Sequence, residues 1–185
     1  MDFKAHILTA WSLTLDYIVP LILITLVLAI VSGLTLGILA PVMLAGYMSS
    51  VLLMLKEGRE PKIPDLFSKM NLFLPLLVFG VVVLILSILG IMLLVLPGIL
   101  FILAVSFFCV YTIPLMVDKN MGLVDAIKES IVMVRKDPIL DHIIIVILFL
   151  GISWVGSFVV IGWLFTQPLA TIFLMSAYME KVKAE

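Results

Sequence analysis

The longest uncharged stretch of the chain decides its fold class. It reads MNLFLPLLVFGVVVLILSILGIMLLVLPGILFILAVSFFCVYTIPLMV, from Met70 to Val117, and holds 48 residues without an Asp, Glu, Lys or Arg. A helix needs ~20 apolar residues to cross the ~30 Å hydrocarbon core of a bilayer. At ~1.5 Å per residue, one helix of this length would reach ~72 Å. The stretch therefore predicts two membrane-spanning helices that fold back on each other.

Two more uncharged runs have the same character. They cover residues 17–55 and 142–179 and hold 39 and 38 residues. The 23 charged side chains, 11 basic and 12 acidic, all lie in the segments Asp2–Asp16, Lys56–Lys69, Asp118–Asp141 and Glu180–Glu185. Hydrophobic residues make up 64% of the chain, against roughly 45–50% in soluble domains. The sequence predicts a single all-α integral membrane domain over residues 1–185.

Glycine and proline, which favour turns, fall near the middle of each run. They are Gly33 and Gly37 in the first run, Gly90 and Pro97-Gly98 in the second, and Gly156 and Gly162 in the third. We therefore expect six transmembrane helices arranged as three hairpins. The expected spans are 17–33, 37–55, 72–90, 97–117, 139–156 and 161–179.

The basic residues predict the orientation of these spans. With three hairpins, both termini and both charged connectors lie on one side of the membrane, and that side carries all eleven Lys and Arg residues. Basic residues favour the cytoplasmic side. We expect a multi-pass protein of the cytoplasmic (inner) membrane, with its N- and C-termini in the cytoplasm.

A short segment that opens with an acid precedes each hairpin, at Asp2, Asp65 and Asp125. Helical spacing of apolar residues predicts that these segments are cytoplasmic amphipathic helices. The predicted apolar stripes are Phe3, Ile7, Trp11 and Leu15 in the first segment, and Val124, Ile127, Ile131 and Val134 in the third. His6, alone on the first segment, is expected to face water.

The spacing of charges suggests a threefold internal repeat. The first charges after the hairpins are Lys56, Asp118 and Glu180, each 62 residues apart. The candidate repeats are 1–58, 59–120 and 121–185. The alternative is that any chain of three hairpins shows three similar blocks, and the last charges before the hairpins are not regularly spaced.

One part of the sequence resembles a known group of proteins. The residues that carry the likeness are Leu96-Pro97-Gly98-Ile99, Pro114-Leu115, Asp118 and Gly122-Leu123-Val124-Asp125-Ala126-Ile127. They resemble a little-characterised multi-pass family that is similar to the membrane domain of some glycerophosphoryl diester phosphodiesterases. The likeness covers about 96–140. It implies a helical membrane domain without catalysis of its own, because the phosphodiesterase chemistry of those enzymes resides in a soluble barrel.

The most polar intramembrane feature lies in the sixth span. Pro168 removes a backbone donor and is expected to kink its helix, and Pro41 is expected to do the same in the second span. Kinked helices beside a polar side chain suit a polar path or binding cavity. The candidate residues are Gln167, Pro168, Thr166, Thr171 and Pro41. The alternative is helix packing, with Gln167 bonded to a neighbouring helix.

A second polar group, Asp137, Asp141 and His142, lies at the expected cytoplasmic edge. Carboxylates and an imidazole are metal ligands, but Asp141 and His142 are adjacent in sequence and point about 100° apart on a helix. We interpret the group as an interfacial polar cluster. Neither a metal nor a cofactor is expected.

Several function classes are disfavoured. A net charge of −1 does not suit nucleic-acid binding. The expected spans carry no ionisable residue at mid-depth, which argues against proton-coupled transport. The sequence shows no nucleophile–base pair, no phosphate-binding glycine loop and no paired intramembrane aspartates, so catalysis is not expected.

Two function hypotheses are left. The first is passive translocation or handling of a small solute or lipid, without energy coupling. The second is a non-catalytic structural or accessory subunit that docks a partner through its cytoplasmic amphipathic helices. Membrane lipids are the expected partners, and a homo-oligomer or a membrane or cytoplasmic protein partner stays open.

Overall fold

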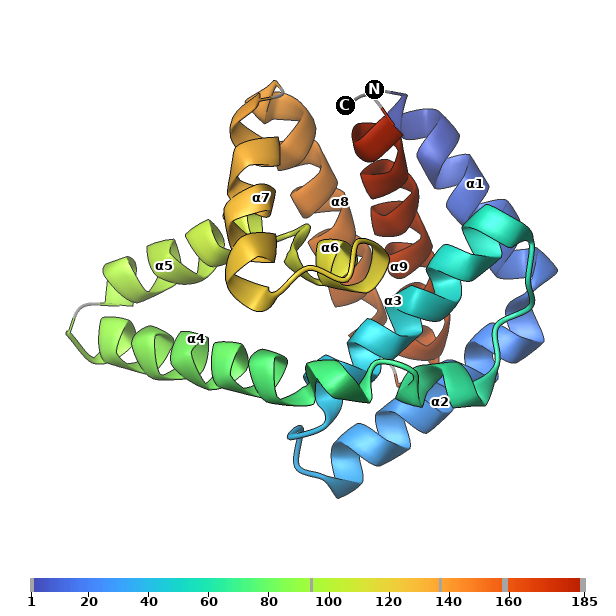
Figure 1. Ribbon diagram of the computed structural model, residues 1–185, viewed down its shortest axis with the longest axis horizontal. Coiled ribbons are helices and arrows are strands. Elements are labelled where there is room, and N and C mark those ends of the chain that lie inside the picture. Colours follow the sequence, from blue (N-terminus) through green and yellow to red (C-terminus); the bar gives the residue numbers. More distant parts are fainter. Residues whose placement is uncertain (1, 94, 137, 158–159, 184–185) are drawn as a thin grey trace.

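The computed structural model describes residues 2–93, 95–136, 138–157 and 160–183, and these residues form helices joined by short turns (Figure 1). The all-helical prediction is confirmed. The helices are α1 Phe3–Asp16, α2 Ile18–Leu34, α3 Ala40–Glu57, α4 Phe73–Leu93, α5 Val95–Phe108, α6 Thr112–Asp118, α7 Leu123–Lys136, α8 Ile139–Ser157 and α9 Val160–Lys183. Two 3₁₀ helices, η1 Ile63–Phe67 and η2 Met70–Leu72, lead from α3 into α4.

Several of the described helices are long and apolar enough to cross a membrane. They are Ile63–Leu93, Val95–Asp118 and Ile139–Gly156, and the pair α1–α2 makes a fourth candidate if its two helices form one broken span. Helices α1 and α2 meet at 90°. Length and composition therefore support a membrane protein with three to four candidate spans among the described residues, fewer than the six expected.

One of the predicted turn glycines, Gly37, lies in a turn, whereas Gly33, Gly90 and Gly98 lie inside helices. Helix α2 ends at Leu34 and α3 begins at Ala40. Between them Leu36 and Gly37 have φ values of 50° and 82°, a region that glycine adopts without steric cost. The Gly37 N–H donates to the Ser32 carbonyl at 2.7 Å. This left-handed turn reverses the chain within a few residues.

Helices α4 and α5 lie side by side and extend away from the other helices (Figure 1). Two glycines allow their close approach, because a Cβ on Gly90 would lie 2.9 Å from the Gly98 Cα. Leu76 and Ser87 are the buried residues of α4, whose remaining surface is almost wholly aliphatic. In a bilayer this surface contacts lipid.

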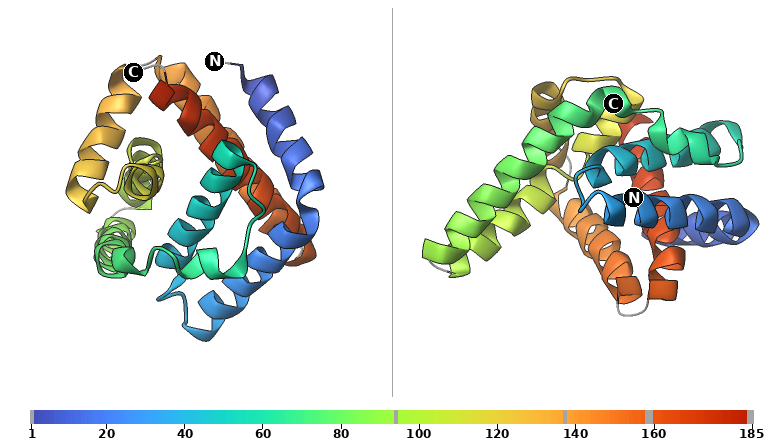
Figure 2. Two further views of the ribbon diagram at one scale, coloured as in Figure 1. Left: turned by 45° about the vertical axis from the view of Figure 1, so that its right-hand side comes forward. Right: turned by 90° about the horizontal axis from the view of Figure 1, so that it is seen from below.

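Helix α3 has the opposite environment. Eleven of its 18 residues are buried, and it lies among α2, α9 and the segment formed by η1 and η2 (Figure 2). Its Tyr47 is fully buried, with its hydroxyl 3.1 Å from that of Thr25 on α2. Helix α3 is therefore a central packing element rather than a lipid-facing one.

Two small residues on α3, Gly46 and Ser50, allow η1 to pack closely against this helix. A Cβ on Gly46 would overlap the backbone carbonyl of Leu66. One turn later, the Ser50 hydroxyl donates to the Asp65 carboxylate at 2.7 Å, and the Arg59 guanidinium donates to it at 2.6 Å. The small residues Gly46 and Ser50 thus admit the connector backbone, where small residues in a membrane helix more commonly admit another helix.

The amphipathic segments are only partly as expected. Helices α1 and α7 form, but the segment at Asp65 is the short η1. In α1 the buried residues are His6, Ala10 and Thr14, whereas Ile7, Trp11 and Leu15 of the predicted stripe are exposed. In α7 the buried residues are Ala126, Ser130, Met133 and Val134, and Val124 is exposed. Helix α1 therefore packs through small and polar residues, whereas α7 buries one residue of its predicted stripe, Val134, together with Met133 and two small residues.

Candidate functional site, an apolar cavity below a polar junction

The ends of three helices from distant parts of the chain meet at one carboxylate. The Lys56 ammonium at the end of α3 pairs with Asp118 Oδ1 at 2.5 Å, and the Tyr178 hydroxyl on α9 donates to Asp118 Oδ2 at 3.0 Å. Asp118 itself ends α6. One acidic side chain therefore links the helices α3, α6 and α9, which are far apart in the sequence.

A second polar pair lies beside this carboxylate. The Tyr111 hydroxyl is 3.0 Å from His142 Nδ1, and the Tyr111 ring centroid is 6.2 Å from that of Tyr178. Tyr111, His142 and Tyr178 are completely buried. We call the five residues Lys56, Tyr111, Asp118, His142 and Tyr178 the polar junction.

A break between α5 and α6 places Tyr111 in the junction. Helix α5 ends at Phe108 and α6 begins at Thr112, so backbone groups at the break need other partners. Ser130 on α7 supplies them: its hydroxyl donates to the Phe108 carbonyl at 2.7 Å and accepts from the Tyr111 N–H at 3.2 Å. The expected span 97–117 therefore contains a break, at the position where Pro114 leaves the Val110 carbonyl without its usual helical donor.

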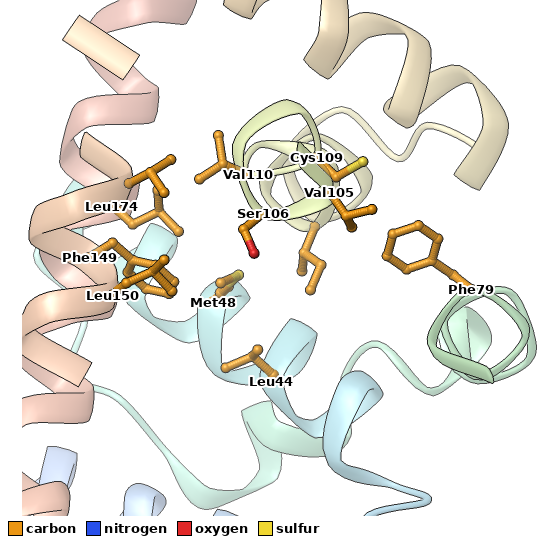
Figure 3. A pocket seen from close by; sticks show the side chains of 12 residues that line it. Leu44, Met48, Phe79, Val105, Ser106, Cys109, Val110, Phe149, Leu150 and Leu174 are labelled. Carbon is orange, nitrogen blue, oxygen red and sulfur yellow. The ribbon is translucent and has the colours of Figure 1, made fainter. Parts of the chain in front are cut away.

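An apolar cavity of about 210 Å³ lies next to the junction (Figure 3). Its wall comes from α3, α4, α5, α6, α8 and α9 and from the α5–α6 break. The lining residues are Leu44, Met48, Phe79, Val105, Ser106, Cys109, Val110, Ile113, Val146, Phe149, Leu150 and Leu174. Ser106 and Cys109 carry the hydrogen-bond donors among these side chains, and the Ser106 hydroxyl points into the cavity (Figure 3).

The cavity and the junction occupy consecutive turns of the same helices. Val146 follows His142 by four residues on α8, and Leu174 precedes Tyr178 by four residues on α9. Val110 directly precedes Tyr111. A partly open apolar pocket thus lies one helical turn from the buried side chains of Tyr111, His142 and Tyr178.

The expected interfacial cluster divides between different partners. Asp141 accepts from the Lys181 ammonium at 3.2 Å, while His142 faces Tyr111 in the junction. Asp137 lies outside the described residues. Among the residues that the structure describes, no group of three or more His, Cys, Asp or Glu side chains could hold a metal ion.

The residues of the expected polar path do not come together at this cavity. Gln167 is buried, and its amide donates to the Thr171 hydroxyl one turn further along the same helix, at 3.3 Å. Thr166 lies against Gly156 of α8. Pro168 lies inside α9, whereas Pro41 lies in the first turn of α3. The expected kink at Pro41 is absent because proline fits the first turn of a helix, where its missing N–H needs no partner.

A Gln167→Leu variant tests whether this polar group matters for folding. Because the amide bonds within its own helix, we expect the free energy of unfolding in detergent to change by less than about 1 kcal/mol. A larger loss would show that Gln167 bonds to a neighbouring helix. The matched control is Thr171→Val, which removes the hydroxyl partner and keeps the side-chain shape.

The prediction that His6 faces water is wrong. Its ring is buried between α1 and α9, with Nδ1 2.7 Å from the Ser176 hydroxyl and Nε2 2.5 Å from Glu180 Oε2. Sequence reasoning missed this group because Ser176 follows His6 by 170 residues. The helical spacing of Ser176 and Glu180, one turn apart on α9, is the one local signal of a shared face.

Comparison of the chain with family models, curated proteins and solved structures finds no match. The likeness to the membrane domain of glycerophosphoryl diester phosphodiesterases therefore stays a prediction.

Proposed function

We propose that this chain is a multi-pass membrane protein that holds part of a lipid or another hydrophobic molecule in its apolar cavity, without energy coupling. The observation that carries the proposal is the cavity between α3, α5, α8 and α9, with its almost wholly aliphatic and aromatic lining. An apolar cavity of about 150 Å³ stays dry and binds benzene. A volume of about 210 Å³ is therefore enough for a short length of acyl chain.

The same cavity disfavours a polar solute. A hydrated solute needs hydrogen-bond partners along its path, and the lining offers only the Ser106 hydroxyl and the Cys109 thiol. Gln167, the most polar candidate, donates its amide hydrogen bond to Thr171 within α9. The first function hypothesis covers passive translocation of a small solute and handling of a lipid, and the cavity favours the lipid.

We extend the proposal to the full topology expected from the sequence. It places six spans as three hairpins in the cytoplasmic membrane, with both termini in the cytoplasm. Helices α1 and α9 pack against each other, so both ends of the described chain lie together (Figure 1). This arrangement supports a common side for the two termini, and the basic connectors support the cytoplasmic side.

Photocrosslinking in nanodiscs tests the cavity. The probe is a phospholipid that carries a diazirine on its acyl chain, and mass spectrometry maps the modified residues. We expect adducts on lining residues such as Val105 and Cys109. Filling the cavity with Ser106→Phe should remove these adducts, because the phenyl ring would occupy the space that the chain needs.

The control is Leu103→Phe, on the exposed surface of the same helix. It should leave the cavity adducts unchanged. Adducts that are confined to exposed surfaces in the unmodified protein would contradict lipid handling and would favour the accessory-subunit hypothesis.

A further inference from the structure

We propose that Ser176, His6 and Glu180 form a second site, a serine nucleophile with its base and its orienting acid, that attacks acyl esters at the membrane surface. The Ser176 Oγ is 2.7 Å from His6 Nδ1, and the opposite ring nitrogen is 2.5 Å from Glu180 Oε2. A nucleophile and a base within hydrogen-bond reach, with the base held by a third group, are the signature of nucleophilic catalysis. This site is independent of the apolar cavity.

The packing of α1 against α9 keeps the three side chains in place. Ala10 of α1 is fully buried, which brings the two helices close together. The Trp11 and Phe165 rings pack edge to face, with their centroids 5.7 Å apart. The His6 side chain is 10% exposed and that of Glu180 is 44% exposed, so the base is held inside while its acid reaches solvent.

The carboxylate sets the tautomer that the chemistry needs. Glu180 accepts a hydrogen bond, so it favours the proton on Nε2. Nδ1 then presents its lone pair to the Ser176 hydroxyl. The sequence offers no local sign that His6 and Ser176 meet, because they come from opposite ends of the described chain.

The three groups open into a pocket of about 280 Å³. Its lining residues are His6, Leu55, Ser176, Met179, Glu180 and Lys183. Leu55 and Met179 suit the apolar part of an amphiphile. The Lys183 ammonium supplies positive charge for a developing oxyanion, a role that the Ser176 N–H cannot take because it lies within α9.

The proposed hydrolysis of an ester needs water as its only other reactant. Ser176 Oγ forms a bond to the ester carbonyl carbon as its proton passes to His6 Nδ1. The C–O bond to the alcohol then breaks, and the alcohol leaves with that proton. A water molecule then loses a proton to the same nitrogen and bonds to the acyl carbon. The bond between that carbon and Ser176 Oγ breaks, the carboxylic acid leaves, and the proton on His6 returns to Oγ.

Labelling with an alkyl fluorophosphonate tests this proposal on the full-length protein in nanodiscs. A reactive serine displaces fluoride and becomes phosphonylated, which mass spectrometry locates. We expect labelling at Ser176, its loss in Ser176→Ala, and a fall of about a hundredfold in the labelling rate in His6→Gln. The control is Ser12→Ala, because the Ser12 hydroxyl bonds to Asp16 without a histidine.

Glu180 is a positioning residue, and its variants separate chemistry from folding. Glu180→Gln keeps the hydrogen bond but donates to Nε2, which moves the ring proton to Nδ1 and blocks the base. We expect labelling to be lost in Glu180→Gln and recovered in part in Glu180→Asp, with unchanged thermal unfolding in both. An unlabelled Ser176 in the unmodified protein, or equal labelling in His6→Gln, would overturn the proposal.

Discussion

Replacing Gly46 with alanine is expected to destabilise the protein by about 2 kcal/mol. The new methyl group would meet the backbone of Leu66 and Asp65, which cannot rotate away as a side chain does. Overpacking of this kind costs up to ~3 kcal/mol. Alanine recovers ~1 kcal/mol through its higher helix propensity, which leaves a net loss.

Gly80→Ala is the matched control, since Gly80 also lies within a helix but has no neighbouring atom within 4 Å of the position that a methyl group would take. Here alanine should stabilise the protein by up to ~1 kcal/mol. Denaturant unfolding in detergent micelles measures both variants. Equal effects at the two positions would contradict the packing of η1 against α3.

Local signals predicted a large part of this fold. Uncharged runs indicated membrane helices, and Gly37 marked the turn between α2 and α3. These features follow from composition and backbone geometry, which act over a few residues. The start of α7 near Asp125 was predicted for the same reason.

The packing faces could not be predicted from apolar spacing. In a soluble protein the apolar stripe of an amphipathic helix faces the core, but the sequence predicted only that α1 is amphipathic and lies on the cytoplasmic side. In a membrane protein lipid also solvates aliphatic side chains, so Ile7 and Trp11 are free to face outward. Small and polar residues such as Ala10 and His6 then make the contact with α9.

The candidate sites were missed for a related reason. Tyr111 enters the junction only because the helix breaks between Phe108 and Thr112, and that break depends on a hydroxyl from Ser130, 22 residues beyond Phe108. His6 and Ser176 are still further apart. Contacts of this kind depend on how helices pack, which spacing along one helix does not encode.

The junction gives the 62-residue spacing a physical meaning. Lys56 and Asp118 are the first charges after the first and second uncharged runs, and they pair with each other. Tyr178 lies two residues before Glu180, the first charge after the third run, and it binds the same carboxylate. The third of these charges, Glu180, pairs with His6 instead, so only the first two of the regularly spaced charges meet each other in space.

Asp118→Ala is expected to cost about 3 kcal/mol, because it removes the carboxylate that accepts from the buried Tyr178 hydroxyl and pairs with Lys56. Lys56→Met should cost less than about 1 kcal/mol, since the Lys56 side chain is 43% exposed and exposed ion pairs contribute little. The loss of stability in Tyr178→Phe should lie between these two values, because this change removes the hydroxyl itself and leaves no buried hydroxyl without a hydrogen bond.

Chemical unfolding in micelles measures the three variants, and Glu57→Gln, an exposed neighbour of Lys56, serves as the control for loss of an acid at this surface. A double variant, Asp118→Ala with Tyr178→Phe, should be more stable than the sum of the two single losses predicts, because the two residues share one hydrogen bond. Full additivity would contradict a direct bond between α6 and α9.

Since Cys109 lies in the cavity beside the junction, Asp118→Ala should also increase the reaction of Cys109 with a water-soluble maleimide, whereas Glu57→Gln should leave this reaction unchanged.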